Sequence, residues 1–340
     1  MTEKKVSIIY TGGTLGMRPS AKGYAPAGDL DALLKERLPE LGMASMPGYE
    51  LSEYEHPLES SNATPHHWYA LAERIEASEK DFDGFVVIHG TDTLAFTASA
   101  LSFLLGGLGK PVILTGSQIP LCEVRNDASG NLIAAMQAIA TGNTNEVCVC
   151  FGRYILRGNR TTKVHATELD AFRSPNFPPL VEIGTHFKFA DIPPLPSDIG
   201  ELAGAPTLCT DRCIAVLSVY PGMAASLIDA VRKTEAAGIV LRCYGVGTAP
   251  TADPDFLAAL KRASKAGVIV VAVSQCLEGS VSLGRYAAGS ALADAGVIGG
   301  FDMTLEAAFT KLHVILALGL DRARIAGLMR KSLRGELTAS

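Results

Sequence analysis

Two short apolar runs that end in glycine turns constrain the fold of this chain more than any other sequence feature. Residues 6–10 lead into TGGTLG at 11–16, and residues 84–88 lead into HGTDT at 89–93. A near-continuous apolar run is typical of a parallel strand covered on both faces by helices. Ligands of open α/β sheets bind beyond the carboxyl ends of such strands. We therefore expect hydroxyl groups, a carboxylate and free backbone N–H groups to meet at one sheet edge, as acyl transfer requires.

Strand-like and helix-like stretches alternate along the whole chain, which favours mostly parallel sheets with helices on both sides. The segment at 154–188 is less regular, and we expect it to extend or cover a sheet edge. Thr64 followed by Pro65 predicts a helix start. Further strands are expected at 111–115, 147–151, 214–219, 239–241 and 268–273, and helices at 68–79, 93–105, 127–141, 224–233, 255–266, 303–318 and 322–331.

The length of 340 residues exceeds one typical hydrophobic core and predicts two domains. Prolines are dense between residues 193 and 206, and such a composition favours an extended linker. We therefore predict two doubly wound, flavodoxin-like α/β domains, the larger at residues 1–190 and the smaller at 213–340. The proline-rich linker is placed at 191–212.

Composition excludes several classes of function. A net charge of -5 argues against a nucleic-acid binder. No apolar run approaches the roughly 20 residues of a membrane span, and the first one is too short for a signal peptide. We therefore expect a cytoplasmic protein with neither nucleic-acid nor membrane partners. The seven cysteines and seven histidines form no metal-binding motif, and the glycines match neither a dinucleotide fingerprint nor a phosphate loop. No metal or cofactor is expected.

A threonine nucleophile needs a base, because its hydroxyl is weak at its ordinary pKa. Lys163 lies in RGNRTTKV at 157–164, among small and apolar residues, and is a candidate for that base. Taken alone, Lys163 reads more readily as a surface charge, Asp92 as a helix N-cap, and Thr14 or Thr91 as a helix cap or turn residue. Spacing by itself leaves these alternatives open.

The motifs, taken together and in this order, resemble the L-asparaginases of the bacterial cytoplasmic type, called type I. The resemblance covers essentially the whole chain, and the order and joint presence of the motifs are highly specific. It rests on YTGGTLGM at 10–17, HGTDT at 89–93, GKPVI at 109–113, TGSQIP at 115–120, RGNRTTK at 157–163, YGVG at 244–247 and the stretch 296–304.

This resemblance implies hydrolysis of the side-chain amide of L-asparagine to L-aspartate and ammonia, without a cofactor. Thr14 would attack the amide carbon, ammonia would leave, and water would cleave the acyl-enzyme. Thr91, Asp92 and Lys163 match a hydrogen-bonded triad, and Tyr24 matches a lid tyrosine that helps to polarise the nucleophile. The backbone N–H groups of Thr14 and Thr91 are expected oxyanion donors. The sequence does not decide which threonine attacks first, and we favour Thr14.

The resemblance also implies a substrate clamp. Ser60 would hold the α-carboxylate, while Asp92 and Glu59 would meet the α-ammonium, with Ser117 as a further substrate-binding residue. Glu59 stands where the related pattern has aspartate, and the extra methylene moves its carboxylate.

Family members complete their active sites with a neighbouring subunit, which implies a homodimer or a homotetramer built as a dimer of dimers. Tyr286 is the expected intersubunit contributor. Type I enzymes are often activated by asparagine at a second site, and allosteric activation is a hypothesis here. Thr248 stands where that site has asparagine. The other matching positions are Thr162, Arg242, Ser274 and Cys276.

Two other functions are compatible with parts of this pattern. An ammonia-releasing amidotransferase subunit resembles asparaginases but carries an extra amino-terminal domain, for which a first strand beginning at about Val6 leaves no room. A non-catalytic asparagine sensor on the same scaffold would have lost its nucleophile or its lysine. The chain retains the residues of the expected chemistry, Thr14, Thr91, Asp92 and Lys163.

Overall fold

The computed structural model describes residues 4–26, 28–196, 199–204, 213–284 and 287–338. It divides into two compact units, Met1–Ile199 and Gly200–Ser340. Each unit holds a largely parallel sheet with helices on both faces, which confirms the predicted fold class. Of the predicted linker at 191–212, residues 197–198 and 205–212 lie outside the described residues.

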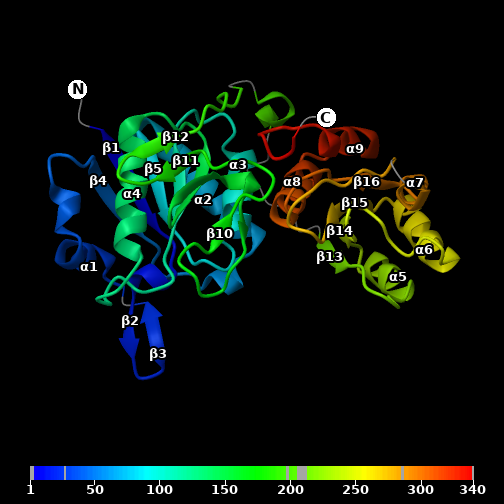
Figure 1. Ribbon diagram of the computed structural model, residues 1–340, viewed down its shortest axis with the longest axis horizontal. Coiled ribbons are helices and arrows are strands. Elements are labelled where there is room, and N and C mark those ends of the chain that lie inside the picture. The colour runs from blue at the N-terminus through cyan, green and yellow to red at the C-terminus, as the bar shows by residue number, and fades with distance from the viewer. Residues whose placement is uncertain (1–3, 27, 197–198, 205–212, 285–286, 339–340) are drawn as a thin grey trace. The chain divides into compact units, whose positions relative to one another are not determined.

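The N-terminal unit is built on an eight-stranded sheet of order β12-β11-β8-β7-β6-β5-β1-β4 (Figure 1). In this sheet the neighbouring strands β4, β1, β5, β6 and β7 are parallel to one another. The direction in which successive strands of the chain are added to the sheet reverses between β1 and β5. That reversal is a topological switch point, where ligands of such sheets bind. The parallel strands are β1 (Lys5–Tyr10), β4 (Gly48–Glu53), β5 (Gly84–Ile88), β6 (Val112–Thr115) and β7 (Val147–Phe151).

The irregular stretch after β7 extends the sheet, which confirms the first of the two roles expected for it. Its strands pair antiparallel: short turns reverse the chain between β7 and β8 and between β11 and β12, and a longer connection returns it from β8 to β11. They are β8 (Tyr154–Arg157), β11 (Val181–Ile183) and β12 (Phe187–Phe189). A two-stranded pair lies beside them, formed by β9 (Thr162–Lys163) and β10 (Phe172–Arg173).

Both faces of this sheet are covered, and alternate residues of a strand enter opposite cores. Val86 and Ile88 of β5 pack on one side, Phe85 and Val87 on the other. The first core also contains α1 (Leu30–Arg37) and α4 (Ala128–Thr141), and the second contains α2 (Pro65–Ala77) and α3 (Leu94–Leu104). The start of α2 is closed by Thr64, whose side chain and backbone form a capping box with His67.

A short hairpin, β2 (Met17–Ser20) and β3 (Gly23–Pro26), projects away from the sheet of the N-terminal unit (Figure 1). It follows directly on a single 3-10 turn, η1 (Thr14–Gly16). The polar, glycine-containing sequence of the hairpin gave no strand prediction. Because the hairpin follows this turn, Tyr24 comes ten residues after the predicted nucleophile Thr14.

The C-terminal unit has a four-stranded parallel sheet in sequential order. Its strands are β13 (Ile214–Ser218), β14 (Gly238–Cys243), β15 (Ile269–Ser274) and β16 (Val297–Gly299). One face is covered by α5 (Ser226–Lys233), α6 (Pro254–Lys265) and α7 (Ala287–Asp294), the other by α8 (Leu305–Ala317) and α9 (Arg322–Arg330). Because the crossovers β13 to β16 all advance in one direction, their helices share one face.

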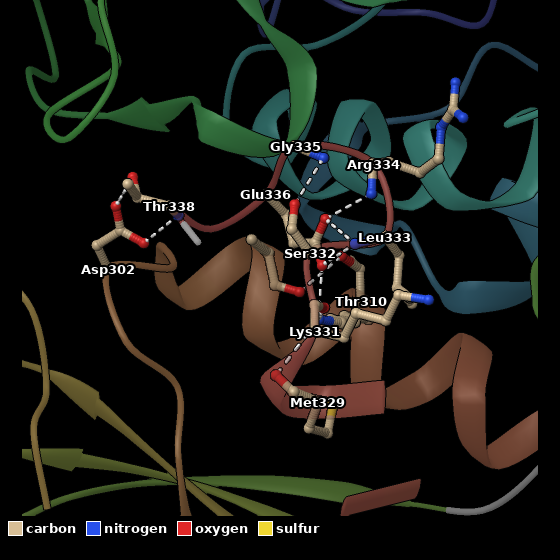
Figure 2. Close-up of polar contacts among 12 residues, drawn as sticks. Asp302, Thr310, Met329, Lys331, Ser332, Leu333, Arg334, Gly335, Glu336 and Thr338 are labelled. Carbon is tan, nitrogen blue, oxygen red and sulfur yellow. Dashed lines mark hydrogen bonds and ion pairs between the residues drawn. The ribbon is translucent and has the colours of Figure 1, made fainter. Parts of the chain in front are cut away.

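A buried ion pair holds the segment that follows α9. Lys311 of α8 and Glu336 are both fully buried, and their ion pair measures 2.5 Å. Figure 2 shows Glu336 also accepting hydrogen bonds from the backbone N–H groups of Leu333 and Arg334. These contacts hold residues 331–338 against α8. Among the described helices, none is long and apolar enough to cross a membrane.

Candidate active site

The glycine turns after β1 and β5 touch backbone to backbone at the switch point. A Cβ atom on Gly13 would lie 2.5 Å from both Cα and N of Gly90, and Gly13 has a φ of 94°. A Cβ atom on Gly90 would lie 2.5 Å from Oγ of Ser60. Only glycine permits this approach and this backbone conformation. The loops that carry Thr14, Thr91 and Ser60 are therefore brought together by the absence of side chains.

The turn that presents Thr14 is held on both sides. Thr11 donates its backbone N–H and its hydroxyl to the carbonyl oxygen of Ile88, each at 3.0 Å, which ties β1 to β5 beyond the sheet. The buried hydroxyl of Tyr10 donates to the carbonyl oxygen of Gly13 at 3.3 Å. Burial raises the pKa of Tyr10, so this donor keeps its proton at all physiological pH values. Thr14 itself is half-buried.

Lys163 reaches the loop after β5 from a distant part of the chain. Its Nζ donates to Oγ1 of Thr91 at 2.8 Å and to Oδ1 of Asp92 at 2.8 Å. Thr91 is buried, whereas the side chain of Asp92 is 60% exposed and that of Lys163 20% exposed. The predicted N-cap alternative does not apply to Asp92, since Thr93 occupies that position of α3. One ammonium thus contacts a hydroxyl and a carboxylate that are adjacent in sequence.

The segment before Lys163 is held by contacts of Arg157 and Arg160 that the sequence pattern did not indicate. The guanidinium of Arg157 makes two hydrogen bonds to the carboxylate of Glu146, at 2.6 and 3.1 Å, with both side chains nearly buried. Arg157 and Arg160 both lie over the ring of Phe177, at 4.4 and 5.1 Å from its centroid. The only sequence signal was a pair of opposite charges at the ends of apolar strands.

The predicted substrate clamp is divided between buried and exposed positions. Ser60 is 2% exposed, and its carbonyl oxygen accepts a hydrogen bond from the hydroxyl of Thr93 at 2.8 Å. Ser117 is 1% exposed, and in the described part of the chain its hydroxyl has no hydrogen-bond partner. Its neighbour Gly116 packs on the loop that carries Thr91. Glu59 is exposed and forms no ion pair within the described residues.

Tyr24 is engaged by a residue that the sequence analysis did not identify. Its hydroxyl donates to Oε1 of Glu123 at 2.6 Å, and this hydrogen bond raises the pKa of Tyr24. The backbone N–H of Leu121 donates to the carbonyl oxygen of Leu15 at 3.1 Å, so the Glu123 loop is joined to the turn of Thr14. No hydrogen bond connects Tyr24 with Thr14 in the described ranges.

The residues matched to a second site lie near the carboxyl ends of β14 and β15. Ser274 donates its hydroxyl to the carbonyl oxygen of Gly245 at 2.7 Å and accepts the N–H of Cys276 at 3.0 Å. Thr248 exchanges backbone hydrogen bonds with Tyr244. Nε of Arg242 and the hydroxyl of Tyr244 are buried without partners among the residues described here.

Thr162 belongs to the N-terminal unit, where it precedes Lys163 in β9. Tyr286 lies outside the described residues. Within those residues, no three histidine, cysteine, aspartate or glutamate side chains are grouped so as to hold a metal ion.

Comparison with known proteins covers both units. The family model for the N-terminal domain of asparaginase matches residues 5–194, and that for the glutaminase/asparaginase C-terminal domain matches residues 213–329. The sequence is 48% identical to L-asparaginase 1 of Escherichia coli over 339 residues, 99% of each chain.

Solved structures agree with these matches. The crystal structure of L-asparaginase I from Vibrio cholerae superposes with a TM-score of 0.91 at 44% identity, over 99% of this chain and 100% of that one. A probable cytoplasmic L-asparaginase from Campylobacter jejuni gives a TM-score of 0.80 at 25% identity, over 97% of this chain and 100% of that one.

Proposed function

This chain belongs to the asparaginase family and is a hydrolase, and from that premise we propose that it converts L-asparagine to L-aspartate and ammonia through a threonine acyl-enzyme. The observation that carries the proposal is the contact of Nζ of Lys163 with both Thr91 and Asp92 at 2.8 Å. This contact lies beside the packed glycine turns, and Thr14 directly follows Gly13 of the first turn. Hydroxyl, base and carboxylate are the groups that acyl transfer from an amide requires.

In the proposed reaction, Oγ1 of Thr14 bonds to the side-chain amide carbon of asparagine, and its hydroxyl proton passes through the Thr91 hydroxyl to the neutral amine of Lys163. The carbon–nitrogen bond then breaks, and the amide nitrogen takes this proton back through the same relay and leaves as ammonia, so that Lys163 is again neutral. Water attacks the resulting ester, and its proton passes through the Thr91 hydroxyl to Lys163 and on to the departing Thr14 oxygen. Backbone N–H groups of Thr14 and Thr91 would bind the oxyanion of both tetrahedral intermediates.

Tyr24 is proposed to help polarise the Thr14 hydroxyl. Its own proton is directed to Glu123, so the lone pairs of its oxygen remain to accept a hydrogen bond. The connection of the Glu123 loop to Leu15 supports a defined position of this tyrosine relative to the Thr14 turn.

Recognition of free asparagine is proposed to use both charges of its backbone. Ser60 would donate to the α-carboxylate, and the exposed carboxylates of Asp92 and Glu59 would meet the α-ammonium. Ser117 would contribute its hydroxyl, and the burial of that hydroxyl without a partner supports the assignment, because an unmade buried hydrogen bond is costly.

We further propose that asparagine binds a second, activating site that includes Arg242, Thr248, Ser274 and Cys276. The buried Nε of Arg242 and hydroxyl of Tyr244, both without partners in the part described, support a polar ligand at this edge of the C-terminal sheet. A homodimer or a homotetramer, with Tyr286 at the subunit contact, and a cytoplasmic location are proposed from the family resemblance. The Campylobacter jejuni neighbour is described as cytoplasmic.

Ammonia release tests these proposals together. The purified protein is incubated with L-asparagine or L-glutamine over a wide concentration range, and ammonia and L-aspartate are quantified. We expect equal amounts of ammonia and aspartate from asparagine, with a sigmoidal dependence of rate on concentration. A strictly hyperbolic curve would remove the second site, and failure to release ammonia from asparagine would reject the proposed function itself.

A further inference from the structure

His89 is a buried histidine two residues before Thr91, and both of its ring nitrogens have hydrogen-bond partners. The residue follows β5 directly and is 4% exposed. Its Nδ1 lies 2.8 Å from the carbonyl oxygen of Gly90, and its Nε2 lies 3.1 Å from the hydroxyl of Thr97 in α3. The proposed reaction does not use this side chain.

The partners of His89 determine its tautomer. A carbonyl oxygen can only accept, so Nδ1 carries the hydrogen that is donated to Gly90. Burial lowers the pKa of His89, which keeps the ring neutral and leaves Nε2 as an acceptor. The hydroxyl of Thr97 therefore donates to Nε2. The ring is fixed at both ends, between a helix and the loop that carries Thr91.

The carbonyl of Gly90 belongs to the same peptide group as the N–H of Thr91. Since this group is planar and trans, a hydrogen bond that holds its oxygen also fixes the direction of its N–H. Among the described residues the Thr91 N–H has no hydrogen-bond acceptor. Its direction is thus set by the fold, while its hydrogen remains available.

Glycine at position 90 makes such a restraint necessary. The close contacts with Gly13 and Ser60 exclude any side chain there. Glycine is also the residue with the greatest backbone freedom, so position 90 by itself would allow the following peptide to rotate. The ring of His89 supplies the restraint that a side chain at position 90 would otherwise give.

We propose that His89 is a positioning residue of this hydrolase: it orients the Gly90–Thr91 peptide so that the Thr91 N–H faces the oxygen that becomes negative in the transition state. The inference rests on the proposed asparaginase function and adds a residue to it. His89 acts through a backbone group and exchanges no proton with the substrate.

The expected effect is on turnover and not on binding. Removing one oxyanion donor lowers kcat by about 10²- to 10³-fold, so a donor that is present but poorly oriented should lower it by about 10- to 100-fold. KM should change by less than about threefold, because the oxyanion exists only in the transition state.

Four variants test this role. His89→Leu removes both ring contacts, and His89→Asn keeps an N–H close to the place of Nδ1. Thr97→Val removes the hydroxyl that holds Nε2 at nearly constant volume, whereas Thr97→Ser keeps it. Ser102→Ala is the matched control, because its buried hydroxyl lies on the same helix and, among the described residues, donates only to the carbonyl of Ala98.

Steady-state kinetics with asparagine, calorimetric binding of L-aspartate and thermal midpoints are measured for each variant. We expect a lower kcat for His89→Leu and Thr97→Val, recovery in His89→Asn and Thr97→Ser, and unchanged KM and aspartate affinity. A folded His89→Leu with normal kcat, a loss that appears only in KM, or no recovery in His89→Asn would overturn the proposal.

If His89→Leu does not fold, Thr97→Val decides: a normal kcat in that variant rejects the positioning role. The Ser102→Ala control should match the unsubstituted enzyme in all three measurements. An unsubstituted protein that releases no ammonia from asparagine would reject the proposed function and this inference together. An active enzyme with unaffected variants rejects only the role of His89.

Discussion

At Gly13 the site has no space for a single methyl group. An added Cβ would meet the backbone of Gly90 at 2.5 Å, and backbone cannot move aside as a flexible side chain can. We expect Gly13→Ala to lower the free energy of unfolding by about 3 kcal/mol through overpacking and backbone strain. Urea denaturation of the variant and the unsubstituted protein measures this difference.

Gly23 provides the matched control for that substitution. Its φ of 103° is close to the 94° of Gly13, but a Cβ there would have nothing within 4 Å. Gly23→Ala should therefore lose only the strain of a positive φ, about 1 kcal/mol. Equal losses in the two variants would show that backbone conformation, and not the contact with Gly90, makes Gly13 necessary.

Lys163 should be required for turnover and nearly irrelevant to stability. Lys163→Met removes the ammonium that contacts Thr91 and Asp92, and loss of an acid–base group lowers kcat by about 10²- to 10⁴-fold. Asp92 is mostly exposed, so its unpaired carboxylate remains hydrated and the unfolding free energy should change by less than about 1 kcal/mol. Ammonia release and urea denaturation measure the two effects.

Lys188→Met is the control for this variant, because Lys188 forms an exposed ion pair with Glu182. These two residues lie on β12 and β11, at the edge of the sheet opposite to β4. The control substitution should leave both quantities unchanged. Turnover by Lys163→Met at a normal rate near neutral pH would remove Lys163 from the mechanism.

Individual site residues differ in how far the sequence could identify them. The motifs that contain Thr14 and Thr91 could be read directly, since glycine turns after apolar runs have a physical reason. Lys163 could be chosen only through family resemblance, because nothing in its spacing indicates a contact 72 residues away. Glu123 and His89 were not identified, since their roles depend on which group the fold places beside them.

Among the helices and strands, those with continuous apolar runs or clear amphipathic patterns were predicted. Strands such as β1 and β5 are covered on both faces, so their sequences could hardly be other than apolar. The hairpin of β2 and β3 was missed because its residues are mostly exposed and polar. The pairing partners of β8, β11 and β12 likewise follow from tertiary contacts that local sequence does not encode.

In the middle of α8, Lys311 forms an ion pair with Glu336 that should contribute to stability only as long as both charges are present. Glu336→Gln leaves a buried ammonium without its counter-charge, and we expect a loss of about 3–5 kcal/mol in unfolding free energy. Burial already lowers the pKa of Lys311, in keeping with a poorly solvated charge. Denaturation followed by circular dichroism measures the loss.

The exposed ion pair between Glu201 and Arg324 is the control, and Glu201→Gln should lose less than about 1 kcal/mol. The double variant Lys311→Met with Glu336→Leu should recover part of the loss, since apolar groups can replace a buried ion pair. A Glu336→Gln variant as stable as the unsubstituted protein would mean that water reaches Lys311.

At the scale of the whole molecule, acid should destabilise the native state partly through His89. Burial, together with the nearby charge of His67, lowers the pKa of His89 below its ordinary 6.5. Between these two values the unfolded chain binds more protons than the native protein, so the unfolding free energy falls as the pH falls below about 6.5. Urea denaturation at a series of pH values measures this slope.

His89→Asn serves as the comparison for that measurement, because it cannot titrate in this range. Its stability should decline less steeply with acid than that of the unsubstituted protein. Parallel pH profiles for the two proteins would show that His89 is protonated as readily in the native state as in the unfolded chain.

The sequence by itself determined two α/β units and the glycine turns at the ends of buried strands, because burial and backbone conformation restrict which residues are possible. The tertiary structure alone decided that strand order reverses between β1 and β5, that Gly13 touches Gly90, and that Lys163 contacts Thr91 and Asp92. These relations join residues far apart in the chain. They depend on the packing of complete surfaces, which no local pattern of residues records.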